Sequence, residues 1–264
     1  MKNKKRTLLW EIGGNELPGF SYLFGTMHVQ DGRIFEAAEK SLDKIRACEC
    51  FAAEFHLEDA KTGINLTLSQ LADNQKLSQF VPAKKYQKLR RILLKTTGFD
   101  LDFLQQASPF AIVNLLTGQI LQSDIPVSLD EYLWDFAKQE GKSMHGIETL
   151  QEQLEVLNKI PMQDQVEMLL DMGRNVKRFR HHLLHVTELY QEGDLQGLFK
   201  SVKKNSKGLR KLLLYQRNEI MAERIAKLVQ QQMFFTAIGV AHLGGEKGVI
   251  HLLKLKGLTV RPVR

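Results

Sequence analysis

The chain has 264 residues, of which 43% are hydrophobic and 25% charged, and its formal net charge is +7. This composition is typical of a globular protein and excludes wholesale disorder. No apolar run reaches the roughly 20 residues of a membrane-spanning helix, and the basic start lacks the apolar core of about 7 to 15 residues that a signal peptide needs. As written, the sequence predicts a cytoplasmic protein without a membrane span.

The first third of the chain predicts a strand, helix, strand pattern. Residues 8–12 and 21–29 are expected to form two strands joined by a turn rich in glycine, as in a hairpin. Apolar residues then recur at helical spacing from Ile34 to Ile45. The run from Cys50 to Phe55 predicts a buried strand near whose end lies the carboxylate of Glu54. This alternation is typical of a parallel sheet.

The rest of the chain predicts further strands separated by long helical stretches. We expect helical residues at about 58–121, a helix at 129–137, a strand at 143–147 leading into Glu148, helical residues at about 150–231, and a final strand, helix and strand at 233–240, 246–256 and 258–263. The predicted fold is α/β. Duplicated strand-GxxH-helix-strand units form its central sheet, and the two long helical stretches are insertions into a single domain, 1–264.

A glycine followed three residues later by a histidine ends two of the predicted strands. The first copy is FGTMH, which ends at His28, and the second is IGVAH, which ends at His242. Glycine lets the chain turn sharply or another group approach closely. Since ligands of open α/β sheets bind at the carboxyl ends of the strands, we expect both histidines to meet Glu54 and Glu148 at that edge.

Imidazoles and carboxylates at one crevice form either a divalent-metal site or an acid/base site. A metal of this kind lowers the pKa of its bound water and polarises a carbonyl, which is hydrolase chemistry. Such sites accept manganese, cobalt, iron or zinc. We expect a divalent metal ion as cofactor, manganese or cobalt in preference to zinc, although residue types alone leave the choice among these metals open.

Segments along most of the chain resemble the TraB/GumN family, which is related to the Tiki proteases. The resemblance covers residues 8–263 and includes SYLFGTMHV, AAEF, LDEYLWDFAKQEGKSMHGIET, YQEGDL, LLLYQRNEIMAERI and FFTAIGVAHLGGEKGVIHLLKLKGLTVRPV. Its most specific parts are the GxxH motifs, the strand-end glutamate, the GIET turn and the RN pair. The resemblance implies a metal-dependent peptide hydrolase, or alternatively a non-catalytic protein that binds and sequesters a peptide or small ligand.

The family's motif positions imply the site residues. His28, Glu54 and His242 would hold or border the metal and its water, and Glu148 would orient a histidine or act as a base. These four are the expected catalytic residues. Arg217 and Asn218 would be substrate-binding residues that stabilise the oxyanion formed at the substrate carbonyl.

Other chemistry-bearing residues have simpler interpretations. The cluster His181, His182 and His185 lacks the glutamate of an HExxH motif. It lies in the segment 174–211, which contains ten Lys or Arg residues and three Asp or Glu residues. We interpret this segment as a solvated helical surface or a docking surface for an acidic partner. Cys48 and Cys50 are expected to be reduced and buried. No nucleotide-binding or serine-hydrolase motif occurs. We expect a peptide or small-molecule substrate and no specific nucleic acid. The long helical insertions are candidate homodimer contacts.

Overall fold

The computed structural model describes residues 6–27, 32–61, 70–71, 75–120, 127–205, 209 and 211–263. It has an α/β fold, as expected, with one mixed sheet and long helical insertions. None of the helices within these ranges is long and apolar enough to cross a membrane. His28 and Val29, the predicted end of the second strand, lie outside the described residues.

The sheet contains the strands that the sequence predicts, with ends that differ by a few residues. They are β1 Leu9–Gly13, β2 Ser21–Thr26, β3 Cys50–Phe55, β4 Ser143–Glu148, β5 Phe234–Gly239 and β6 Thr259–Pro262, in the spatial order β4-β3-β5-β2-β1-β6. β4, β3, β5 and β2 are parallel to one another, and β1 is antiparallel to both β2 and β6. β1 and β2 form the predicted hairpin.

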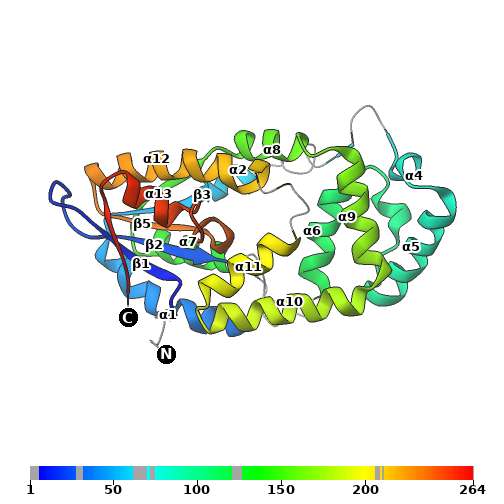
Figure 1. The fold of residues 1–264 in the computed structure, drawn as a ribbon, viewed down its shortest axis with the longest axis horizontal. Coiled ribbons are helices and arrows are strands. Elements are labelled where there is room, and N and C mark those ends of the chain that lie inside the picture. The colour runs from blue at the N-terminus through cyan, green and yellow to red at the C-terminus, as the bar shows by residue number, and fades with distance from the viewer. Residues whose placement is uncertain are drawn as a thin grey trace.

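Helices cover both faces of this sheet. The two crossovers, β2-α1-β3 and β5-α13-β6, run in opposite directions along it, so right-handed connections place α1 (Gly32–Ala47) and α13 (Val249–Leu255) on opposite faces. α7 (Leu129–Gln139) packs beside α1 against β3 and β4, and α12 (Gln216–Gln231) packs beside α13 against β4 and β5 (Figure 1). The central strands are buried because both of their faces are covered.

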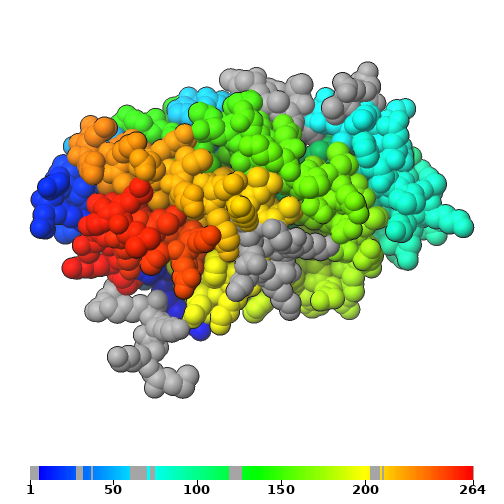
Figure 2. Space-filling model, turned by 45° about the horizontal axis from the view of Figure 1, so that its top comes forward, coloured from blue at the N-terminus to red at the C-terminus, as the bar shows by residue number. Residues whose placement is uncertain are grey.

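The insertions form a helical lobe beyond one end of the sheet. Their helices are α2 Leu57–Lys61, α4 Leu77–Phe80, α5 Ala83–Thr97, α6 Pro109–Ile120, α8 Leu150–Asn158, α9 Met162–Arg174, α10 Val176–Gln191 and α11 Leu195–Asn205, with a short 3₁₀ turn at Leu101–Leu104 (η2) and a π-helical turn at Lys211–Tyr215 (η3). Another 3₁₀ turn, Val240–His242 (η4), follows β5 directly and lies outside the insertions. α4, α5 and α6 pack with α9, while α10 runs back to α1. Figure 2 shows the resulting elongated surface, with the lobe at the end opposite α12 and α13.

Proline and glycine residues divide the insertions into separate helices. Pro82 lies between α4 and α5, Pro161 between α8 and α9, and Gly193 between α10 and α11. The last helix begins at Val249, three residues later than predicted, because Gly248 occupies its N-cap position after a glycine-containing turn.

Candidate active site

The parallel register brings four strand ends to one edge of the sheet. Thr26 at the end of β2 pairs with Gly239 at the end of β5, and Phe55 at the end of β3 pairs with Glu148 at the end of β4. Glu54 and Glu148 therefore lie at the same edge as the second GxxH motif. His28 follows Thr26 by two positions and lies outside the described residues.

Arg217 joins the two glutamates. It lies in the first turn of α12, directly after the π-helical turn η3, and its side chain is 14% exposed. Its Nε and Nη2 donate to Glu148 at 2.6 to 3.1 Å, and Nη2 also donates to Glu54 Oε2 at 2.9 Å. Although burial lowers the pKa of Arg217, the hydrogen bonds and charges of both carboxylates outweigh it and raise that pKa above its ordinary value.

Glu54 has a different contact on each oxygen. While Oε2 accepts from Arg217, Oε1 accepts the backbone N–H of Gly239 at 2.5 Å and faces Nε2 of His242 at 3.7 Å. A Cβ at Gly239 would lie 2.7 Å from Oε1, so only glycine lets the carboxylate come this close to the backbone. Close packing of Glu54 against the backbone therefore requires the glycine of the second motif, and the spacing of the motif alone does not reveal this requirement.

Asn218 fixes the orientation of His242. Its Nδ2 donates to the backbone carbonyl of Lys247 at 2.7 Å, which leaves Oδ1 to face Nδ1 of His242 at 2.6 Å. Because Oδ1 only accepts, Nδ1 carries a proton, and in the neutral imidazole Nε2 therefore presents a lone pair toward Glu54. His242 is 4% exposed and Asn218 1%, so this tautomer is held within the protein.

The site has further contacts that the sequence did not indicate. Gln153, in the first turn of α8, donates to both Glu54 and Glu148 at 3.3 Å. Arg224, two turns along α12 from Arg217, binds both oxygens of Glu152 and the carbonyl of Ile147 at 2.7 to 2.8 Å. Two arginines of α12, one near its start and one two turns later, therefore hold this helix against the end of β4. A glutamine or arginine on an amphipathic helix gives no sequence signal of such contacts.

A cluster of buried polar side chains lies at the end of β2. The hydroxyl of Thr26 donates to Asp130 of α7 at 2.6 Å, and the hydroxyl of Tyr190 of α10 donates to the carbonyl of Gly25 at 2.7 Å. Burial, together with the charge of Asp130, raises the pKa of Tyr190 well above its ordinary value, so its hydroxyl remains a donor. These bonds attach α7 and α10 to the strand that leads into the first GxxH motif.

Glu54 and His242 fit a divalent cation. Two ligand atoms that each lie about 2.1 Å from a shared cation in a tetrahedral site are about 3.4 Å apart, close to the 3.7 Å between Glu54 Oε1 and His242 Nε2. Two carboxylates against the single guanidinium of Arg217 leave a formal charge of −1. Within the described ranges, no group of three or more His, Cys, Asp or Glu residues is placed to hold a metal. The described part of the chain thus supplies two donors, an imidazole and a carboxylate.

The remaining sequence candidates lie elsewhere. Cys48 and Cys50 are both free and buried, and burial raises the pKa of Cys48 to about 12 and that of Cys50 above its ordinary value, as expected of unreactive thiols. His181, His182 and His185 lie on α10, where His181 is exposed. His185 is exposed as well and His182 is half-buried, and both also line a cavity between helices.

Comparison with known proteins supports the resemblance seen in the sequence. The model of the TraB/PrgY/gumN family matches residues 8–262. Three similar curated proteins are Metalloprotease TIKI2 of Danio rerio (26% identity over 91% of this chain and 58% of that protein), Metalloprotease TIKI1 of Xenopus tropicalis (26%, 98% and 62%) and a Metalloprotease TIKI homolog of Nematostella vectensis (25%, 92% and 65%). The chain spans about three fifths of their length. No solved structure matches it significantly.

Proposed function

The chain belongs to the TraB/PrgY/gumN family, and we propose that it is a metal-dependent peptidase whose reactive site is the strand-end edge of the sheet. The observation that carries this proposal is the pair formed by Glu54 Oε1 and the Nε2 lone pair of His242, 3.7 Å apart at the edge where the first GxxH motif also begins. The metalloprotease names of its relatives support the reaction class.

Each described residue has a role in this proposal that follows from its contacts. A divalent cation bound by Glu54, His242 and His28 would polarise the substrate carbonyl and lower the pKa of a bound water. Asn218 holds the proton on Nδ1 of His242 and so keeps Nε2 available. Arg217 holds both glutamates in place and balances part of their charge.

These contacts change the roles that the resemblance implied. Both ends of the Asn218 amide are engaged, so we assign it to positioning His242 and not to the oxyanion. Glu148 binds Arg217 and Gln153, and no described histidine contacts it; we assign it to holding Arg217. Arg217 keeps one amino group, Nη1, without a hydrogen bond to the described residues, so we retain it as the donor to a substrate oxyanion.

Cleavage of a diverse peptide library, followed by mass spectrometry, tests the proposal. The chain is stripped of metal with a chelator and then supplied separately with manganese, cobalt and zinc. We expect cleavage that needs the metal, is lost in Glu54→Gln and His28→Ala, and is unchanged in Glu39→Gln, which alters an exposed carboxylate of α1.

The alternative function is capture of a peptide without cleavage at the same edge. A metal-loaded chain that binds peptides and cleaves none would support this alternative and reject the peptidase. A single domain over the whole chain, a manganese or cobalt preference, a cytoplasmic location and a homodimer stay predictions.

A further inference from the structure

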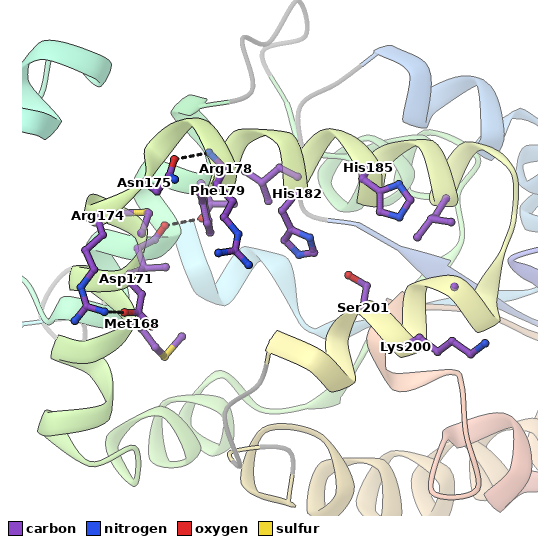
Figure 3. A pocket seen from close by; sticks show the side chains of 16 residues that line it. Met168, Asp171, Arg174, Asn175, Arg178, Phe179, His182, His185, Lys200 and Ser201 are labelled. Carbon is purple, nitrogen blue, oxygen red and sulfur yellow. Dashed lines mark hydrogen bonds and ion pairs between the residues drawn. The ribbon is translucent and has the colours of Figure 1, made fainter.

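A cavity of about 1030 Å³ lies between helices of both insertions, apart from the glutamates at the strand ends. Its walls come from α6, α9, α10 and α11 (Figure 3). This volume reaches the upper end of the range of ligand pockets, about 300 to 1,000 Å³. None of the contacts described for the candidate active site involves the side chains that line it.

The rim of this cavity is cationic. Arg174, Arg178 and Lys200 line it together with a single carboxylate, Asp171, which forms an ion pair with Arg174 at 2.9 Å. Neither Arg178 nor Lys200 has an ion-pair partner in the part of the chain that the structure describes. The positive charge of the rim is therefore only partly compensated, and it favours an anionic ligand.

The basic side chains of α10 are arranged along one face of the helix. His182 and His185 follow Arg178 by four and seven positions, which places all three side by side. Figure 3 shows Arg178 and His182 directed from α10 into the space between α10 and α11, with Ser201 of α11 opposite them. The stripe offers several donors to an extended ligand that runs along the helix.

The inner wall of the cavity is apolar. Its lining includes Val113, Met172, Phe179, Leu183 and Leu189. At Gly197 a Cβ would lie 2.9 Å from Leu189 Cδ2, so the glycine allows α11 to pack closely on α10 beside this wall. A ligand that fills the cavity therefore needs aliphatic groups as well as anionic ones, which a peptide with acidic and aliphatic side chains has and a phosphate backbone lacks.

α11 is a wall shared by the cavity and the strand-end edge. Its residues Lys200 and Ser201 line the cavity, while Phe199 contacts the backbone of Gly244 and Gly245, just after the turn η4 that carries His242. A peptide in the cavity would thus lie on the far side of a single helix from the proposed reactive histidine. Binding at such a distance can position a long substrate without contact with the reacting atoms.

We propose that this cavity binds an acidic segment of a peptide that also carries aliphatic side chains. The carboxylates contact Arg178, Lys200 and the two histidines of α10 that line the cavity, His182 and His185, and the aliphatic groups contact the apolar wall. As a subsite for substrate, the inference rests on the peptidase function proposed above; as a binding site, it stands on the lining residues alone.

Fluorescence anisotropy with labelled peptides tests the binding. One probe alternates glutamate and leucine over roughly twelve residues, and a second has glutamine in place of every glutamate. We expect the acidic probe to bind on the order of tenfold more tightly at low salt, and Arg178→Gln to remove most of that difference. Arg180→Gln is the matched control, because Arg180 is exposed on the same helix and does not line the cavity.

Equal affinity for both probes would overturn the proposal, and so would equal effects of Arg178→Gln and Arg180→Gln on the affinity for the acidic probe. Displacement of the acidic probe by a single-stranded oligonucleotide at a lower concentration than unlabelled peptide requires would also overturn it. Circular dichroism of both variants establishes that each remains folded. Because Arg178 is solvent-exposed, its substitution should leave the thermal midpoint unchanged.

The failure of this inference and the failure of the peptidase are distinguishable. Glu54→Gln should leave probe binding intact, since Glu54 does not line the cavity. Binding of the acidic probe that depends on Arg178, in a chain that cleaves no peptide, would keep the cavity and reject the peptidase. Cleavage of acidic and neutral peptides at equal rates, unchanged in Arg178→Gln, would keep the peptidase and reject the cavity as a subsite for its substrate.

Discussion

Replacing Arg217 with methionine should strongly destabilise the fold. The side chains of Arg217, Glu148 and Glu54 are 14%, 3% and 10% exposed, and the substitution leaves the two carboxylates without their shared cation. Removing one member of a buried ion pair costs about 3 to 5 kcal/mol, because the remaining charge stays desolvated. We expect a loss in this range in the free energy of unfolding, measured by urea denaturation at pH 7.

Arg224→Met is the matched control on the same helix. Arg224 and its partner Glu152 are 38% and 37% exposed, so solvent screens their ion pair and its loss should cost about 1 kcal/mol or less. Combining Arg217→Met with Glu148→Gln should recover part of the stability, since one uncompensated charge is removed. Equal losses in Arg217→Met and Arg224→Met would refute the argument that the strand-end group is a buried charge cluster.

Three further changes should have separable effects. Asn218→Ala should weaken metal binding by about 10- to 100-fold in isothermal titration calorimetry, because the Nδ1 proton of His242 loses its acceptor. Gly239→Ala should reduce peptide cleavage by roughly 100-fold, since the new Cβ would lie 2.7 Å from Glu54 Oε1 and displace that carboxylate. Hydrogen bonds from Arg224 lower the pKa of Glu152 from 4.5 to about 2. The contribution of the ionised Glu152 to folding stability is therefore present above pH 4.5 and is lost as the pH falls toward 2. Over that window, the difference in urea midpoint between the wild-type chain and Glu152→Gln should shrink.

Each of these changes has its own control. Asn218→Asp keeps an acceptor for the histidine proton and should bind metal more tightly than Asn218→Ala; the reverse order would contradict the positioning role. Gly118→Ala, in α6, adds a Cβ with nothing within 4 Å and should leave cleavage unchanged, so similar losses in both glycine variants would refute the steric argument. A midpoint difference for Glu152→Gln that does not vary with pH would show that the ion pair is not its cause.

Local patterns were sufficient to predict the sheet and the edge of the site. Two short apolar runs and the glycine-rich turn before Ser21 predicted the hairpin, and the strand-helix-strand order predicted the parallel strands. Since parallel strands end at one edge, the convergence of Glu54 and Glu148 followed from their positions in the sequence. The family resemblance directed attention to Arg217 and Asn218, which the structure brings to the same edge.

The partners of these residues could not be predicted from the sequence. Gln153 and Arg217 come from helices far apart in the chain, and their contacts depend on how α8 and α12 cross the strand ends. The same holds for the cavity, because the sequence did not show which helix lies opposite Arg178 and His182 of α10. Periodicity predicts the face that a side chain occupies, whereas its neighbour is determined by tertiary packing.

Metal content after equilibrium dialysis tests the central claim most directly. The chain is dialysed separately against manganese, cobalt and zinc, and bound metal is measured by mass spectrometry beside His242→Ala, Glu54→Gln and the control His251→Ala, which alters an exposed histidine of α13. The account predicts about one ion per chain in the wild type and in His251→Ala, and strong loss in the other two variants. Metal retained in full by both His242→Ala and Glu54→Gln, or none bound by the wild type, would contradict it.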